Sequence, residues 1–149
     1  MEFRNATLDD LPAIVGLLAD DDLGRGREHR GGPLPEEYLV AFAAMAEQPG
    51  NRMIVAVEDG VVVGCLQLTR IAGLSRRGML RAQIEAVRIA RGRRGAGIGD
   101  ALMRHAIDLA RRDGCGLVQL TTDRSRDDAH RFYERLGFVA SHLGMKLEI

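Results

Sequence analysis

Four glycines lie within eight residues, at the point where an apolar segment gives way to a helix-like one. The segment reads RGRRGAGIGDALM and covers residues 91–103. Glycine destabilises a helix interior by roughly 1 kcal/mol relative to alanine, so its abundance before a helix needs a reason. Glycines permit left-handed backbone and close approach to a ligand, and the first amides of a helix have no internal partner. Together with the neighbouring arginines, the segment predicts an anion site made of backbone amides, although a turn needed only for packing remains an alternative.

Two familiar phosphate-binding patterns do not fit this segment. A P-loop requires lysine and then serine or threonine after the last glycine, whereas Ile98 and Asp100 follow the glycines here. A dinucleotide-binding fingerprint would need its third glycine where Asp100 stands. Asp123 ends the next predicted strand, where a ribose-binding acid would lie, so a Rossmann-type nucleotide-binding protein stays open as an alternative.

The rest of the chain alternates between strand-like and helix-like patterns. Thr7 and Asp10 resemble a capping box, and the Asp-Gly pair within residues 58–61 is a strong hairpin signal. Residues 80–89 alternate, and four of them are expected on one face of a strand: Gln83, Glu85, Val87 and Ile89. The predicted strands cover 1–6, 52–58, 61–71, 80–89, 115–123 and one or two within 138–149, and the predicted helices cover 11–18, 35–48, 98–113 and 125–136. This order predicts an α/β chain with a mixed sheet and helices on both faces.

Composition narrows the class of protein. The 149 residues fit one domain, 1–149, and a net charge of zero gives no indication of nucleic acid or a membrane surface as a partner. The charged N-terminus lacks the apolar core of a signal peptide, and no apolar run is long enough to span a membrane, so we expect a cytoplasmic protein. The two cysteines stand in apolar surroundings, which favours buried small hydrophobes over reactive thiols. The histidines show no metal-ligand spacing, so no metal is expected, and no serine lies in a hydrolase elbow.

The segment Arg94-Gly95-Ala96-Gly97-Ile98-Gly99 directly follows IEAVRIA, and AHRFYERLGF follows the next predicted strand. In these motifs and in its element order the chain resembles the GNAT family of N-acetyltransferases over essentially its full length. The resemblance implies a mostly antiparallel sheet of six to seven strands and acetyl-CoA as cosubstrate. It also implies that the coenzyme pyrophosphate meets the amides of the loop and helix start, at Arg94, Gly95, Ala96, Gly97, Ile98, Gly99 and Asp100.

The same resemblance assigns backbone contacts to the pantetheine arm along the strand before the loop, at Val87, Arg88 and Ile89. The Val87 amide is the expected donor to the thioester carbonyl. In the family an amine attacks the thioester directly, so no protein nucleophile is required. Tyr133 matches the family's tyrosine that serves as general acid at the coenzyme sulfur, and a core aromatic without a chemical role is the alternative.

Glu85 is the candidate general base, because it is an acid on a largely apolar strand, and an unpaired buried carboxylate is costly. Burial could raise its pKa, or a water could relay the proton; a structural salt bridge is the alternative. Histone-type members of the family have their base at the position of Gln83, which cannot take a proton, so that substrate class is not expected.

The acceptor side of the chain is less defined by sequence. Arg126 stands where many family members have asparagine, and it either reaches a coenzyme phosphate or faces solvent. The family's acceptor site involves the segment matching Asp20–Pro33, whose acids could attract a cationic amine and whose arginines could hold a carboxylate. We expect a small-molecule or peptide amine as the acceptor and a homodimer as the assembly. A CoA-binding regulatory module without turnover is the alternative.

Overall fold

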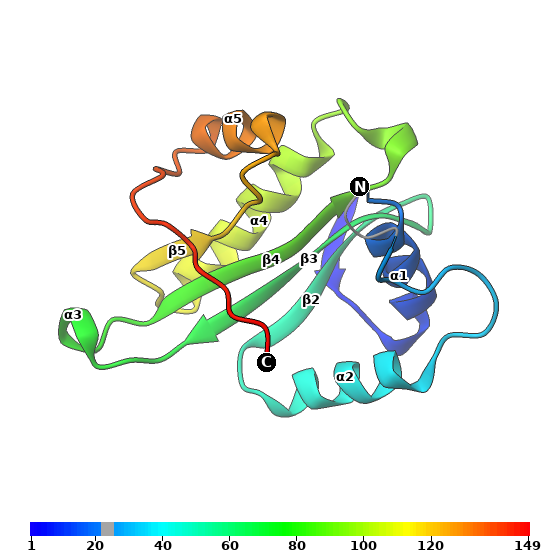
Figure 1. Ribbon diagram of the computed structural model, residues 1–149, viewed down its shortest axis with the longest axis horizontal. Coiled ribbons are helices and arrows are strands. Elements are labelled where there is room, and N and C mark those ends of the chain that lie inside the picture. The colour runs from blue at the N-terminus through cyan, green and yellow to red at the C-terminus, as the bar shows by residue number, and fades with distance from the viewer. Residues whose placement is uncertain (22–25) are drawn as a thin grey trace.

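The protein, as a computed structural model, is described over residues 1–21 and 26–149 and forms one mixed sheet with the strand order β1-β2-β3-β4-β5. The first four strands are antiparallel to one another in sequence order, whereas the last pair, β4 with β5, is parallel (Figure 1). The strands are β1 (Glu2–Asn5), β2 (Asn51–Glu58), β3 (Val61–Ile71), β4 (Arg81–Ile89) and β5 (Leu117–Leu120). The predicted α/β class and mixed sheet are therefore confirmed.

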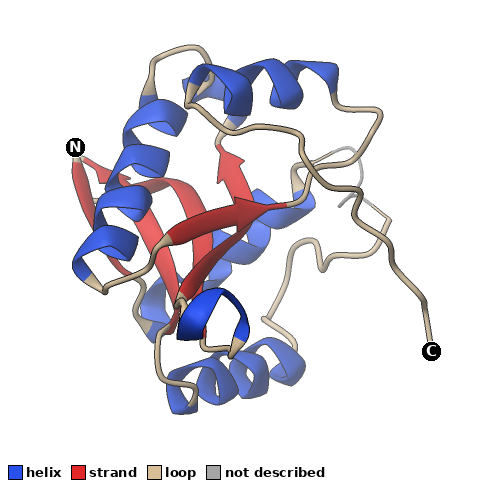
Figure 2. Ribbon diagram, turned by 90° about the vertical axis from the view of Figure 1, so that its left-hand side faces the viewer, coloured by secondary structure: helices blue, strands red, loops and turns tan. Residues whose placement is uncertain are grey.

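Helices cover both faces of this sheet, as expected (Figure 2). They are α1 (Leu11–Ala19), α2 (Glu36–Glu47), the single turn α3 (Ser75–Gly78), α4 (Ile98–Arg112) and α5 (Asp127–Arg135). Apolar residues of α4 and α5 pack on one face, in a core that includes Ile84, Leu102 and Met103. Apolar residues of α1 and α2 pack on the other face, around Val55 and Cys65.

Two features predicted from local sequence, a capping box and a hairpin turn, are present in the structure. The Thr7 backbone amide donates to the Asp10 carboxylate over 2.7 Å, so the predicted capping box forms, on a 3₁₀ turn (Leu8–Asp10) that leads into α1. Arg4 adds an ion pair to the same carboxylate at 2.7 Å. Asp59 and Gly60 both adopt positive φ, 50° and 78°, between β2 and β3. Two left-handed residues match the twist of a tight hairpin, which confirms the predicted one.

The strand count is the main difference from expectation, because the described residues form five strands instead of six or seven. The predicted strand or strands within 138–149 are absent. This tail extends away from the sheet in Figure 2, and Gly144 lies beside Thr121, just after β5. A strand exists only where its backbone pairs with a neighbouring strand, and the tail pairs with none in the part of the chain that the structure describes. Its alternating apolar side chains are consequently exposed: Leu143, Met145, Leu147 and Ile149.

No helix within the described ranges is both long and apolar enough to cross a membrane. Cys65 is fully buried in the core beside α1, and burial raises the pKa of its thiol to about 12. Its predicted role as a small buried hydrophobe is confirmed. Cys115 is half-buried.

Candidate active site

A β-bulge in β4 is the feature that organises the site. Gln67 of β3 pairs with Glu85, but Cys65, two residues earlier in β3, pairs with Arg88, three residues later in β4. Ala86 adopts a left-handed conformation, with φ of 53°, and takes up the extra residue. A bulge of this kind inserts one residue and so shifts the alternation of the side chains that follow it. Glu85 and Arg88, three residues apart, therefore point to the same face of the strand.

The expectation that Gln83, Glu85, Val87 and Ile89 share one face is therefore wrong. Val87 and Ile89 pack against the core beneath α4 and α5. Glu85 and Arg88 lie on the opposite face, which they share with Gln67 and Cys65 of β3. Simple alternation fails because the bulge inserts one extra residue of β4 between the pair of Gln67 with Glu85 and the pair of Cys65 with Arg88.

Beyond the bulge, β4 loses its neighbour on the β5 side. The pairing of β4 with β5 covers only Arg81–Ile84 of β4 and Leu117–Leu120 of β5. The remainder of β4 stays bonded to β3 on its other edge, down to the pair of Ile89 with Gly64. The two parallel strands thus separate, and the backbone edge of Glu85–Ile89 that would face β5 has no strand beside it.

The glycine segment follows directly and leads into α4. Gly95 and Gly97 have φ of 80° and 78°, and Gly97 is the residue from which α4 begins. A side chain at either glycine would meet no atom within 4 Å, so both are required by conformation and leave open space beside the backbone. The Arg94 side chain donates to the Ile89 carbonyl over 3.1 Å, which ties the loop to the end of β4.

Gly99 has a different role from the two left-handed glycines. A Cβ at this position would lie 3.6 Å from both Ile89 and Phe132, so α4 approaches β4 and α5 closely here. Asp100, in the first turn of α4, accepts from Arg104 at 2.7 Å. The first amides of α4 have no helical acceptor and point past the loop, as at any helix start. This arrangement provides donors for an oxyanion at the mouth of the gap between β4 and β5.

Tyr133 comes to the same region from α5. Its ring packs between Phe132 and Phe138, with ring centroids 5.2 and 6.0 Å apart. Burial raises the pKa of Tyr133, while the positive charges of Arg88 and Arg126 oppose that rise. The phenol is therefore protonated at neutral pH and available as a hydrogen-bond donor.

Glu85 differs from its expected environment, because its side chain is exposed and not buried. It makes no hydrogen bond or ion pair with any residue in the described ranges, which leaves the salt-bridge alternative without a partner there. The neighbouring Gln83 accepts from Gln119 of β5 over 2.6 Å. The carboxylate of Glu85 is thus open to solvent on the α1 face of β4, and its role as a base stays a prediction.

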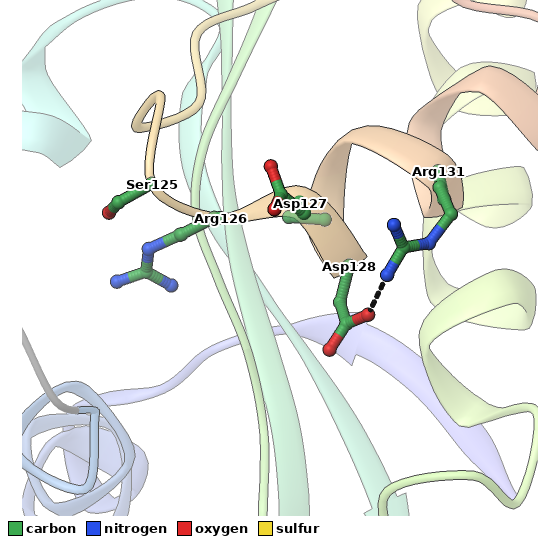
Figure 3. Close-up of a pocket in the computed structure, with 6 residues that line it drawn as sticks. Ser125, Arg126, Asp127, Asp128 and Arg131 are labelled. Atoms are coloured by element: carbon green, nitrogen blue, oxygen red, sulfur yellow. Dashed lines mark hydrogen bonds and ion pairs between the residues drawn. The ribbon is translucent and has the colours of Figure 1, made fainter.

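Sequence reasoning missed a charge cluster that joins three distant parts of the chain. Asp21, just after α1, binds Arg88 of β4 at 3.3 Å and also binds Arg126 at the start of α5. Figure 3 shows the guanidinium of Arg126 pointing away from Asp128 and Arg131 of α5. No local signal could have revealed the cluster, because its members are 67 and 105 residues apart. The Arg126 side chain is consequently held by an ion pair and only partly exposed to solvent. Its contact with a coenzyme phosphate stays a prediction.

Other charged residues of the predicted acceptor segment have local or single partners. Asp20 is paired with Arg91 at 2.7 Å, and Glu28 accepts from the Tyr38 hydroxyl. Asp22 and Arg25, which belong to the same segment, lie outside the described residues. Asp123, the acid that kept a Rossmann-type site open, accepts from the backbone and side chain of Ser125 and closes a local turn.

The family model of the acetyltransferase (GNAT) family matches residues 18–138. The chain belongs to the GNAT family. An aminoalkylphosphonate N-acetyltransferase from Salmonella typhimurium is 30% identical and aligns over 95% of this chain and 86% of its own. The streptothricin acetyltransferase of Streptomyces lavendulae is 32% identical, over 93% and 81%.

A solved structure described as a transcriptional regulator from Bacillus halodurans C-125 superimposes with a TM-score of 0.96, at 47% identity over 99% of each chain. The fold expected from the resemblance is thus confirmed by a structure as well as by the family. Because the curated relatives are acetyltransferases and the family match spans the site, this chain is an N-acetyltransferase. The Rossmann-type alternative is ruled out by the same match.

Proposed function

We propose that this GNAT enzyme transfers the acetyl group of acetyl-CoA to the primary amine of a small molecule. The amine nitrogen would attack the thioester carbonyl, a C–N bond would form, and the C–S bond would break to release CoA thiolate. One proton leaves the amine and one is taken up by the sulfur, so the reaction balances without a covalent enzyme intermediate.

The observation that carries this proposal is the gap between β4 and β5 beside the glycine loop. The unpaired β4 edge from Val87 to Ile89 offers backbone groups to an extended pantetheine arm, in the way a missing strand would. The open space at Gly95 and Gly97 and the amides through Asp100 suit a pyrophosphate. Arg94 would add charge at the same end, and the Val87 amide would donate to the thioester oxygen.

Tyr133 is proposed as the proton donor to the departing sulfur. Burial raises its pKa, which keeps the phenol protonated and able to donate to the sulfur. Glu85 is proposed as the base, through a water, because its carboxylate is solvent-exposed on the face of β4 opposite the glycine loop. A base on the far face from the coenzyme loop suits an amine that approaches from the α1 side.

The acceptor class is inferred from the relatives. Two curated relatives are named for acetylation of an aminoalkylphosphonate and of streptothricin, which supports a small-molecule amine here. Homodimer formation and a cytoplasmic location stay predictions.

The test is a screen of small amines with acetyl-CoA, in which released CoA is detected with a thiol reagent. The protein's own thiols contribute little signal, because Cys65 is fully buried and burial also raises the pKa of Cys115. We expect rapid CoA release with at least one amine class. A protein that binds CoA, as judged by thermal stabilisation, yet releases none with any amine would contradict turnover.

A further inference from the structure

Two guanidinium groups converge on a single carboxylate oxygen at the α1 side of β4. Both Arg88 and Arg126 contact Oδ2 of Asp21. All three side chains are largely shielded, with exposed fractions of 15% for Arg88, 31% for Arg126 and 11% for Asp21. Because both arginines reach the same oxygen, neither makes the parallel, two-oxygen contact with Asp21 for which guanidinium forks are built.

Arg88 retains unused bonding capacity in this cluster. One of its terminal nitrogens donates to the Val87 carbonyl over 2.8 Å and the other faces Asp21, whereas its Nε is buried and has no hydrogen-bond partner among the described residues. Buried donors in folded proteins are nearly always satisfied, so an unpartnered one at a site needs an explanation. A group with two or three oxygens could satisfy this N–H together with the contacts now made to Asp21.

The cluster lies beside the proposed reaction centre and on its acceptor side. Arg88 directly follows Val87, but the bulge turns its side chain to the face of β4 opposite the glycine loop. Arg126 stands at the start of α5, and both arginines are close enough to Tyr133 to lower its pKa against the effect of burial. An anion held here would therefore belong to the acceptor and not to the coenzyme.

We propose, resting on the acetyltransferase function above, that Arg88 and Arg126 form an anion subsite for the acceptor. The acceptor is then a small primary amine that also carries an oxyanion group, namely a carboxylate, phosphonate or phosphate. Asp21 is the internal counter-ion that this group displaces from the two arginines. The subsite fixes the distance between the oxyanion and the amine, and so orients the amine toward the thioester.

The test compares matched amines that differ only in the anionic group. The set is 2-aminoethylphosphonate, β-alanine, O-phosphoethanolamine and the uncharged n-propylamine. The wild-type enzyme should use at least one charged amine with a kcat/KM about 100-fold above that of n-propylamine, as expected for a charge-assisted, two-arginine contact. The best of the three charged amines identifies the oxyanion. Preference for n-propylamine would overturn the proposal.

Arg126→Gln should raise the KM of the preferred acceptor about tenfold or more and leave the KM of acetyl-CoA within about twofold. Asp21→Asn should lower the acceptor KM, because it removes the competing carboxylate. The control is Arg124→Gln, since Arg124 is exposed and forms no hydrogen bond or ion pair with the described residues. If Arg126→Gln weakens acetyl-CoA and not the acceptor, the arginine serves the coenzyme and the proposal is wrong.

Calorimetric titration of the same amines onto the CoA-bound protein separates this proposal from the proposed function. Binding of a charged amine that is lost in Arg126→Gln supports the subsite even if no acetyl transfer occurs. Acetyl transfer to n-propylamine as efficient as to every charged amine supports the enzyme and overturns the subsite.

Discussion

The proposed coenzyme side and the proposed acceptor side of this site differ in the groups that form them. On the coenzyme side, Gly95 and Gly97 leave space beside bare backbone, and the donors are amides of a loop and a helix start. On the acceptor side, Asp21, Arg88 and Arg126 meet through their side chains. A site made of backbone tolerates many side chains and loses function only when the backbone is blocked. A site made of paired charges can change its ligand through a single substitution.

The largest effect is expected on the backbone side. Gly97→Glu places a side chain at φ of 78°, in the space proposed for the pyrophosphate, and adds a negative charge there. Acetyl-CoA binding should fall by roughly 100-fold or more, since strain, sterics and repulsion act together. Loss of thermal stabilisation by acetyl-CoA measures it.

Gly92→Ala is the matched control, because a Cβ at Gly92 would also meet no atom within 4 Å and its φ is not left-handed. This variant should bind normally. A Gly97→Glu protein with native circular dichroism and unchanged affinity for acetyl-CoA would refute the backbone site.

Removal of the two proposed proton-transfer groups comes next in size. The double variant Glu85→Gln/Tyr133→Phe should lose turnover by about 10²–10⁴-fold, while acetyl-CoA binding stays near that of the wild type. Steady-state kinetics and thermal shift measure the two quantities separately. Phe132→Leu, a neighbouring aromatic change on α5, controls for packing. Wild-type turnover in the double variant would show that the assignment of both groups is wrong.

The bulge that divides the two sides can be probed at Ala86. Its φ of 53° disfavours a branched side chain, so Ala86→Val should destabilise the fold by about 1–2 kcal/mol, whereas Ala86→Gly should be neutral or slightly stabilising. Urea denaturation gives the difference in the free energy of unfolding. Equal stability of the valine and glycine variants would argue that the left-handed conformation is not maintained in solution.

The last effect concerns the start of α1, the helix that precedes Asp21. Hydrogen bonds from Arg4, and then from Thr7, lower the pKa of Asp10 to about 2. Because the folded pKa lies below the unfolded value of 3.8, the stabilisation is present above about pH 4 and disappears as the pH falls through 2. Asp10→Asn should therefore cost about 1–2 kcal/mol at pH 7.

Denaturation of Asp10→Asn and wild type at pH 7 and at pH 2.5 tests this. The difference between the two proteins should shrink at the lower pH. Asp9→Asn is the neighbouring control, since Asp9 is exposed and makes no hydrogen bond or ion pair with the described residues, and it should behave as wild type at both pH values.

Features that depend on neighbouring residues could be predicted from the sequence, and features that depend on distant ones could not. The Asp59-Gly60 turn, the capping box at Thr7 and the glycine loop are each encoded within a few residues, and all three formed. The prediction of which β4 side chains share a face failed, because nothing in RAQIEAVRI marks Ala86 as left-handed. The bulge is evident only in the pairing of β4 with β3. The ion pairs of Asp21 join segments far apart in the chain. In the tail after α5, apolar and polar residues alternate as they do in a strand, but this alternation does not provide a neighbouring strand with which the tail could pair.

The bulge also determines which positions an engineer should vary to obtain a new acceptor. A library designed on regular alternation would randomise Gln83, Glu85, Val87 and Ile89 together, and would place half of its diversity in the packed layer beneath α4. Because Ala86 is an extra residue in β4, the positions on the proposed acceptor face are 83, 85 and 88. Deletion of Ala86 would remove the extra residue, and regular alternation from Glu85 would then keep Val87 and Ile89 in the packed layer and Arg88 on the opposite face.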